Sequence, residues 1–318
     1  MTRFVNFIIF FIAIFLLFSI LAVSWIYIPV NSVEATEKVV EIPYGHNTTR
    51  IRLLLEKENI IRPYNIAFQT LTKLMNIEEK LQSGEYQFSS SQNLLEIIEQ
   101  LVKGKVVLYR ITIPEGYQAK QIARILEDKE IAVAKELLLL IQEDNEYKEG
   151  YLFPDTYEFP KDFGAVNVLR MMKKNFEEIV YRKVSPDQKF LAGLDFHKII
   201  ILASIIEKEA QGEDDKAKIA SVFYNRLTDG MRLQSCATVQ YLLDKPRENL
   251  TQQDLEIESP FNTYLYSGLP PEPICNPGLD SILAAAYPAE EDYLYFVLGK
   301  DGQHVFTKTY QEHLDNKP

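Results

Sequence analysis

One uninterrupted apolar stretch near the N-terminus constrains this chain more than any other feature. From Phe7 to Ile28 the residues are apolar apart from Ser19 and Ser24. A helix of about 20 apolar residues is long enough to cross the hydrocarbon core of a bilayer. Trp25 and Tyr27 lie near the end of the stretch, where amphipathic aromatic side chains favour the membrane interface. The sequence therefore predicts an N-terminal transmembrane helix.

The charges on either side of this stretch predict its orientation. Arg3 is the charge that precedes it, and Glu34 and Glu37 follow it. By the positive-inside rule the N-terminus stays in the cytoplasm, the chain crosses the cell membrane once, and the residues after Pro29 lie outside. The alternative is a cleaved signal peptide with Ala22-Val23-Ser24 as its cleavage site. Both interpretations export the rest of the chain.

The size and charge of the chain restrict its partners. With 318 residues it is long enough for a sizeable core in one or two domains. Its net charge of −11 and its lack of a long basic cluster disfavour a nucleic-acid partner. Two cysteines, Cys236 and Cys275, are too few for a cysteine-based zinc ribbon or a disulfide-dense scaffold. They permit one disulfide, and two free thiols are the alternative.

An internal repeat follows the apolar stretch. Ile42-Pro43-Tyr44-Gly45 matches Ile113-Pro114-Glu115-Gly116, and apolar residues recur at the same offsets behind both copies. Each copy predicts a strand, a Pro-x-Gly turn and a helix. Two copies are too few for a solenoid. They indicate two small α+β units, or one motif reused at the start of two domains.

These patterns divide the chain into three regions and predict an α+β fold. Residues 1–30 form the transmembrane anchor with its short cytoplasmic start, residues 31–110 a linker and a small α+β module, and residues 111–318 a larger α+β domain. Within the module we expect helices at 64–74 and 91–101, the second capped by Ser91, and a strand at 84–88. The module has no catalytic cluster, so we expect it to bind or position a ligand.

The larger region should alternate helices with connections rich in Pro, Gly and Tyr. Helices are expected at 117–128, 133–143, 166–180, 195–210 and 214–228. Residues 259–277 hold five of the fifteen prolines and predict a long ordered loop of the kind that often builds sites. Alternating residues at 293–298 and 304–306 predict a hairpin.

The familiar motifs of metal and phosphate chemistry do not occur in this sequence. There are four histidines, His46, His197, His304 and His313, without a His-Glu-x-x-His pattern. A Gly-rich phosphate loop and a Gly-x-Ser-x-Gly elbow are also missing. No metal or cofactor is expected.

The candidate catalytic residue is Glu207. At about 100° per residue it falls on the same helix face as Phe196, Ile200 and Ala203, and so extends an apolar stripe. Partial loss of water favours the protonated form of a carboxyl group, which suits a proton donor near neutral pH. Glu209 falls on the opposite side and is expected to be solvated. The alternative is that Glu207 merely reaches water at the end of its helix.

Aromatic and amide side chains elsewhere suit a carbohydrate ligand, although each also has an ordinary structural explanation. The aromatic candidates stack on sugar faces, and the polar ones hydrogen-bond hydroxyl and acetamido groups. The predicted substrate-binding residues are Tyr151, Asp155, Tyr157, Tyr224, Asn225, Gln234, Ser235, Asn262, Tyr264 and Asn276.

Ordered motifs across essentially the whole chain resemble the MltG (YceG-like) family of endolytic murein transglycosylases. The motifs are Ile113-Pro114-Glu115-Gly116, residues 149–157, Ala203–Glu209, residues 222–227, Leu233-Gln234-Ser235, Asn262-Thr263-Tyr264, residues 268–271, Asn276-Pro277-Gly278, residues 293–297 and the tail residues His304, Phe306 and His313. The resemblance implies that Glu207 is the family's catalytic glutamate and that residues 31–110 form a LysM-like module.

The implied reaction is non-hydrolytic cleavage of the MurNAc-β-1,4-GlcNAc bond within nascent peptidoglycan strands. It leaves 1,6-anhydroMurNAc ends and limits strand elongation, and peptidoglycan synthases are candidate partners. Glu207 would protonate the glycosidic oxygen and then accept the proton of the muramic C6 hydroxyl. Where many members have Asp-Pro after the Leu-Gln-Ser/Thr motif, this chain has Cys236-Ala237. This departure makes a second catalytic carboxylate there less favoured.

Two alternatives stay open. A muramidase-type hydrolase would use Glu207 with a distant acid such as Asp155. A non-catalytic glycan-binding scaffold of the wall-synthesis machinery would act through residues 39–109. The position of Cys236 and Cys275 beside two of the motifs suggests a disulfide between the Gln234-Ser235 loop and the Pro-rich loop.

Overall fold

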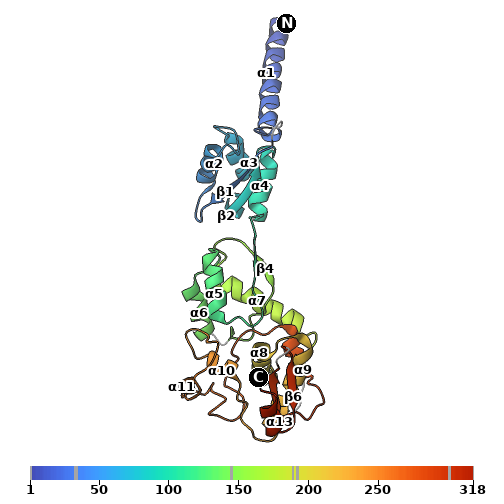
Figure 1. Cartoon of the computed structure of the whole chain (residues 1–318). Helices are drawn as coiled ribbons and strands as arrows, with labels where there is room; N and C mark the ends of the chain where they lie inside the picture. Colours follow the sequence, from blue (N-terminus) through green and yellow to red (C-terminus); the bar gives the residue numbers. More distant parts are fainter. Residues whose placement is uncertain are drawn as a thin grey trace. The chain divides into compact units, whose positions relative to one another are not determined.

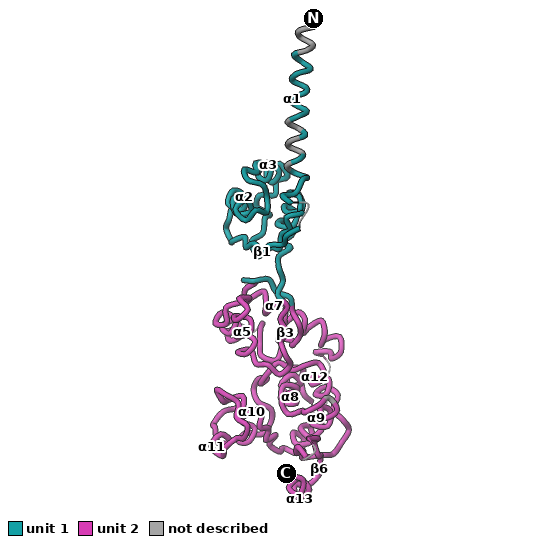
Figure 2. Tube along the Cα trace, turned by 45° about the horizontal axis from the view of Figure 1, so that its top comes forward, with its two compact units in different colours: residues 1–109, 158–162 teal, residues 110–157, 163–318 magenta. Residues whose placement is uncertain are grey.

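The computed structural model describes residues 2–31, 35–143, 146–187, 190, 193–299 and 302–317. Within them the chain is a mixed α+β protein whose strands form small two-stranded sheets (Figure 1). It divides into two compact units, coloured separately in Figure 2. Unit 1 comprises residues 1–109 and 158–162, and unit 2 comprises residues 110–157 and 163–318.

Helix α1 (Thr2–Tyr27) begins unit 1. Its described apolar side chains are largely exposed, with Phe15 at 71% and Ile20 at 65%. Within the described residues, no helix combines the length and hydropathy needed to cross a bilayer. The side chains of Arg3, Ala22 and Trp25 lie outside the described residues, as does Glu34.

The rest of unit 1 is an α+β module with its own core. Strand β1 (Glu37–Ile42) pairs antiparallel with β2 (Gly84–Ser89). The core consists of buried side chains from both strands and from α2 (Thr48–Lys57), α3 (Ile66–Leu74) and α4 (Leu94–Lys103). A short 3₁₀ helix, η1 (Glu78–Lys80), precedes β2.

The predicted start of α4 at Ser91 is wrong. Asn93 accepts a hydrogen bond from the Glu96 N–H, and the Glu96 side chain accepts one from the Asn93 N–H. This reciprocal capping box satisfies two backbone donors at the start of the helix, which a serine two residues earlier cannot do. The helix ends at Gly104, which has the left-handed conformation with φ +61°.

Both copies of the sequence repeat form the predicted strand, turn and helix. The first copy joins β1 to α2, and the second joins β3 (Tyr109–Thr112) to α5 (Ala119–Asp128). Each turn places a glycine at positive φ, +76° at Gly45 and +73° at Gly116. β3 pairs with β4 (Thr156–Phe159) in a second two-stranded sheet.

The five helices predicted for the larger region are confirmed. They are α5, α6 (Ala134–Glu143), α7 (Ala165–Val180), α8 (Phe196–Glu209) and α9 (Glu213–Thr228). Shorter helices follow at α10 (Cys236–Gln240), α11 (Gln252–Leu255), α12 (Leu279–Ala286) and α13 (Tyr310–Asp315). Residues 259–277 carry no helix or strand, as predicted.

The predicted hairpin near the C-terminus is also confirmed. Strands β5 (Tyr295–Leu298) and β6 (His304–Thr307) pair antiparallel, with Phe296 opposite Phe306.

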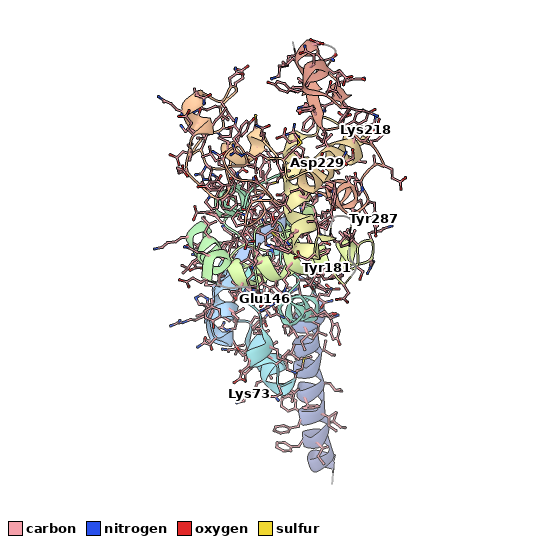
Figure 3. All side chains as sticks on the ribbon, turned by 90° about the horizontal axis from the view of Figure 1, so that it is seen from below. Lys73, Glu146, Tyr181, Lys218, Asp229 and Tyr287 are labelled. Carbon is pink, nitrogen blue, oxygen red and sulfur yellow. The ribbon has the colours of Figure 1, made fainter. Side chains whose placement is uncertain are left out.

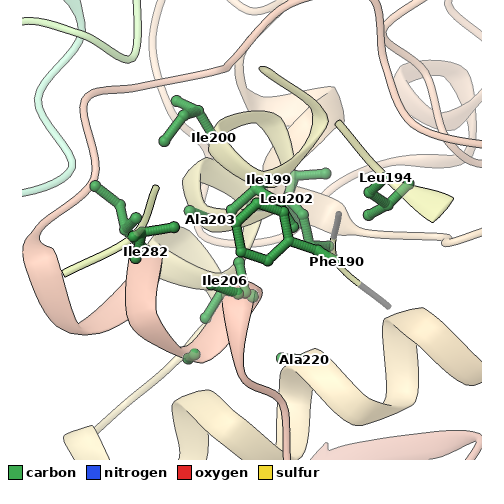
Figure 4. Packing of buried hydrophobic residues seen from close by; sticks show 14 of the residues in the cluster. Phe190, Leu194, Ile199, Ile200, Leu202, Ala203, Ile206, Ala220 and Ile282 are labelled. Carbon is green, nitrogen blue, oxygen red and sulfur yellow. The ribbon is translucent and has the colours of Figure 1, made fainter. Parts of the chain in front are cut away.

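Helix α8 lies at the centre of the core of unit 2. Every residue from Ile199 to Ile206 is buried, so the helix is apolar on all sides and not along one stripe. It packs against α9 and α12, and Figure 4 shows its side chains with Ala220 of α9 and Ile282 of α12. Because burial of each large aliphatic side chain contributes about 1.5–3 kcal/mol, this helix is a rigid base for the residues at its end.

Candidate active site

Glu207 lies in the last turn of α8, where the buried part of the helix reaches the surface. Its side chain is 9% exposed, while the next residue, Lys208, is exposed. The helix is capped at its start by Asp195, whose side chain accepts the N–H of Lys198, and it ends at Glu209. The carboxyl group therefore extends from a fixed, apolar helix into a nearly closed environment.

One carboxylate oxygen of Glu207 is held by the start of α12. Glu207 Oε2 accepts the N–H of Gly278 at 3.0 Å and the hydroxyl of Ser281 at 2.6 Å. Gly278 is the N-cap of α12, so its N–H belongs to a helix end that favours negative charge. Both donors fix the rotation of the carboxyl group.

Lys216 on α9 approaches the same oxygen. Its Nζ lies 3.6 Å from Glu207 Oε2 and 4.0 Å from Glu115 Oε2. The Lys216 side chain is 10% exposed and that of Glu115 is 52% exposed. A buried ammonium needs such partners, because removal from water is costly. Among the described residues no donor reaches Glu207 Oε1, so that oxygen is the one able to meet a ligand.

Two glycines lie against these carboxylates, and at Gly278 the approach is closer than a Cβ allows. A Cβ on Gly116 would lie 3.5 Å from Glu207 Cγ, and a Cβ on Gly278 would lie 2.0 Å from Glu115 Oε1. The Gly116 N–H donates to the carbonyl of Asn276, so the two segments pair directly. The Pro-Glu-Gly turn and the Asn-Pro-Gly loop are therefore joined beside Glu207.

Asn276 joins these two segments to a third one. It is fully buried; its Oδ1 accepts the N–H groups of Gly150 and Leu152, each at 2.9 Å. Its Nδ2 donates to the carbonyl of Tyr117 at 2.9 Å and to Glu149 Oε1 at 2.6 Å. Because all the polar capacity of its side chain is used inside the protein, Asn276 positions loops in this structure.

Glu149 lies behind this junction as a half-buried residue whose carboxyl group is enclosed by backbone and amide donors. Both of its oxygens accept the N–H of Ala119 at the start of α5, and Oε1 also accepts Nδ2 of Asn276. Burial raises the pKa of Glu149 from 4.5 to about 7, against the opposing effects of these hydrogen bonds and of Lys120.

The expectation that Glu209 is solvated is wrong. Its side chain accepts the hydroxyl of Ser235 and, at 3.4 Å, the N–H of Ala237. Ser235 is the N-cap of α10, and it is 3% exposed. Helix periodicity placed Glu209 away from Glu207 correctly, but a loop packs on that face and occupies it.

Several predicted substrate-binding residues are committed to internal hydrogen bonds. The hydroxyl of Tyr157 donates to the carbonyl of Phe153, and that of Tyr224 to the carbonyl of Ala285. The amides of Asn225 and Asn262 each donate to two backbone carbonyls. These residues shape the domain in this structure.

Other predicted residues are exposed or half-buried. Gln234 is exposed and has φ +51°, a conformation that non-glycine residues rarely adopt and that is frequent at functional sites. Tyr264 is half-buried, and its hydroxyl lies 3.0 Å from Cys236 Sγ. Asp155 is exposed and accepts the amide of Asn175 at 2.8 Å. Gln234 and Tyr264 therefore border the Ser235 segment that Glu209 holds.

The predicted disulfide is wrong, since both cysteines are free. Cys275 is buried, its Sγ donates to the carbonyl of Ser204 on α8 at 3.3 Å, and burial raises the pKa of its thiol. Cys236 is exposed and contacts Tyr264 instead. The two thiols belong to different sets of contacts.

The sequence does not predict three residues around the site: Lys216, Ser281 and Glu149. Lys216 lies in a charged run, residues 213–218, where it resembles a solvated lysine. Ser281 has a sequence signal. It is the third residue of the helix that follows the Asn-Pro-Gly motif, and a hydroxyl group in the first turn lies at the helix end that favours an anion. The residues around Glu149 in the sequence do not indicate that its carboxyl group is enclosed.

Comparison with known proteins gives consistent matches over most of the chain. A model of the YceG-like family matches residues 40–318. An endolytic murein transglycosylase of Bacillus subtilis (strain 168) is 35% identical over 310 residues, which cover 90% of this chain and 85% of the relative. One of Streptococcus pneumoniae serotype 2 (strain D39) is 28% identical over 329 residues, covering 90% of this chain and 59% of the relative.

A solved structure also matches. The crystal structure of a YceG-like protein from Listeria monocytogenes has 35% sequence identity and a TM-score of 0.56, covering 89% of this chain and all of that one.

Proposed function

Because the chain belongs to the YceG-like family, we propose that it is an endolytic murein transglycosylase, as its Bacillus subtilis relative is named. Its substrate is the glycan strand of peptidoglycan, and it cleaves the MurNAc-β-1,4-GlcNAc bond within strands. It is a lyase, so cleavage leaves a 1,6-anhydroMurNAc end and consumes no water.

Glu207 is the catalytic acid and base. The observation that carries this assignment is that Oε2 is fixed by Gly278 and Ser281, whereas no described donor reaches Oε1. A carboxyl group held in this way presents one oxygen in a defined direction, which is what a general acid requires.

The reaction proceeds through two proton transfers at one oxygen. Glu207 first gives its proton to the glycosidic oxygen, and the bond from that oxygen to C1 of MurNAc breaks. The GlcNAc unit leaves with a 4-hydroxyl group. The C6 hydroxyl of MurNAc then bonds to C1, and its proton returns to Glu207, so the enzyme is restored and all atoms are accounted for.

The surroundings of Glu207 support the charged stage of this cycle. After the first transfer the carboxylate is stabilised by the Gly278 N–H, the Ser281 hydroxyl and the ammonium of Lys216. Such donors act without rearrangement, which is why fixed dipoles lower barriers effectively. A second, water-activating carboxylate is not needed for ring closure, in contrast to hydrolysis.

The N-terminal helix anchors the enzyme to the cell membrane, with the rest of the chain outside. The apolar run Phe7–Ile28 and the exposure of its described side chains support this assignment, since exposed apolar surface of that extent requires cover. Protease added to intact spheroplasts should digest residues 40–318. Protection of these residues would contradict the orientation.

Residues 31–110 form a LysM-like module that holds the glycan strand. Support comes from the resemblance and from the self-contained core of this module, which lets it act as a binding unit. Peptidoglycan synthases are the expected partners of an enzyme that cuts nascent strands beside the membrane.

Product analysis of Glu207→Gln and the unchanged protein tests the reaction. Digests of sacculi in H₂¹⁸O should yield anhydro ends without ¹⁸O from the unchanged protein. Glutamine is close to glutamate in size but cannot donate and re-accept a proton, so we expect the rate to fall by about 10²–10⁴-fold. Glu178→Gln, an exposed change on α7, should keep the normal rate.

Other outcomes separate the alternatives. Reducing ends that carry one ¹⁸O per cut would indicate a hydrolase. Near-normal cleavage by a folded Glu207→Gln variant would remove the catalytic assignment and favour a scaffold.

A further inference from the structure

A cavity of about 340 Å³ lies in unit 2, lined by residues that contribute nothing to the surroundings of Glu207. Part of its wall is aromatic: the ring of Tyr151 lies 5.0 Å from that of Phe176, which lies 5.9 Å from that of Tyr181. Its volume is at the lower end of the range for ligand pockets, which suits one or two amino-acid residues or a single sugar.

The remaining lining is charged, with both signs present. Lys173 Nζ lies 3.2 Å from Glu146 Oε1 and 3.6 Å from Glu177 Oε1, so this lysine is already paired. Figure 3 labels Glu146 and Tyr181, which both line the cavity. Lining of this kind suits a ligand with charged and apolar parts, and it is poorly matched to an uncharged sugar.

Lys148 has capacity for a further anion. Its Nζ is 3.9 Å from Glu272 Oε1, at the outer limit of an ion pair, and its side chain is 39% exposed. Glu272 is closer to His197, with 3.1 Å between Glu272 Oε2 and His197 Nε2. An incoming carboxylate could therefore bind the Lys148 ammonium without breaking a short ion pair.

The wall of the cavity is fixed to α8. The Tyr151 hydroxyl lies 2.9 Å from His197 Nδ1, and His197 connects in turn to Glu272. Gly150, beside Tyr151, packs so closely that a Cβ there would lie 2.6 Å from Pro273 Cγ. The site is therefore largely preformed, which lowers the entropic cost of binding.

The distance to Glu207 matches a peptide substituent of murein. His197 and Glu207 lie in the first and last turns of α8, ten residues apart, which is about 15 Å along a helix. Five extended peptide residues span about 16–18 Å. Murein carries short peptides on the lactyl group of muramic acid, and these end in a free carboxylate.

We propose that this cavity binds the carboxylate end of the peptide carried by the muramic acid at Glu207, with Lys148 as its partner. The proposal rests on the proposed function for the identity of the sugar. It makes the enzyme selective for strands that carry peptides of about five residues, since two or three residues are too short to reach.

The test uses the full-length protein in detergent and two substrates of equal strand length, one with pentapeptides and one stripped of them. The measured quantity is the ratio of the two cleavage rates. We expect the unchanged protein to prefer pentapeptide strands by roughly three- to tenfold, the range for a partly exposed charged contact. Lys148→Met should bring the ratio close to one. Lys174→Met is the matched control, because Lys174 on α7 is 71% exposed and pairs with Glu178; it should keep the normal ratio.

Calorimetric titration with a free synthetic pentapeptide provides a second, independent reading. The unchanged protein and Lys174→Met should bind it, and Lys148→Met should bind it more weakly. A ratio near one in the unchanged protein, or a ratio that Lys148→Met does not change, overturns the proposal. Failure of the unchanged protein to cleave either substrate refutes the proposed function, and the titration then still decides whether the cavity binds the peptide.

Discussion

The enclosed carboxyl group of Glu149 makes the stability of unit 2 depend on pH. Because burial raises its pKa from 4.5 to about 7, the folded state binds this proton more tightly than the unfolded state does. Its contribution to stability is thus fully present below about pH 4.5 and is lost as the pH rises through 7. The pKa difference corresponds to about 3 kcal/mol.

Glu149→Gln should remove this dependence. Glutamine resembles the protonated acid, and its oxygen can still accept the N–H of Ala119 and the amide of Asn276. We therefore expect the variant to lie within about 1 kcal/mol of the unchanged protein near pH 5. At pH 8 it should be more stable by up to about 3 kcal/mol.

The buried thiol of Cys275 offers a local assay. It is 0% exposed in the folded protein, so it reacts with a thiol reagent only after unit 2 opens. Labelling of Cys275 across a urea series, measured by mass spectrometry at pH 5 to 8.5, gives the free energy of unfolding at each pH. The exposed variant Glu178→Gln is the control and should follow the unchanged protein. A difference between Glu149→Gln and the unchanged protein that is constant with pH, or lower stability of the variant at pH 8, would refute the reasoning.

Two further predictions concern the groups around Glu207 and Glu209. Lys216→Met removes the buried cation between Glu207 and Glu115 and should lower the cleavage rate by roughly tenfold or more. Lys218→Met changes an exposed lysine on the same helix and should leave the cleavage rate unchanged. Equal rates in both variants would show that the cation is unimportant. Glu209→Leu leaves the buried Ser235 hydroxyl without its acceptor and should cost about 1–3 kcal/mol in urea unfolding, whereas Glu209→Gln should recover most of the loss. If the leucine and glutamine variants were equally stable, the hydrogen bond would contribute nothing.

Much of the fold was predictable because it depends on local periodicity. The helices of unit 2, the paired strands near Phe296 and Phe306, and the two Pro-x-Gly turns are each determined by residues close together in the chain. The position of Glu207 at the end of an apolar helix also follows from a single segment. These features can be predicted without knowing which elements pack against them.

The contacts across the fold were not predictable in the same way. Helix periodicity predicts that Glu209 faces water because periodicity describes one helix alone, and the loop that covers Glu209 lies 26 residues further along the chain. The same limit explains the wrong disulfide, since proximity of motifs does not say which way a thiol points. Lys216 is buried, and the carboxyl group of Glu149 is enclosed, by elements distant in sequence, so their roles become visible only in three dimensions.

The duplicated Pro-x-Gly turn provides an internal reference within a single molecule. A Cβ on Gly45 would meet nothing within 4 Å, whereas one on Gly116 would touch Glu207 and Lys208. Both glycines have nearly the same positive φ, so alanine at either position pays the same backbone penalty. A substitution at Gly45, in the first copy, therefore costs backbone strain alone. At the second copy a Cβ would add ordinary van der Waals contact at 3.5 Å, so any difference between alanine at Gly116 and alanine at Gly45 reports directly on the site.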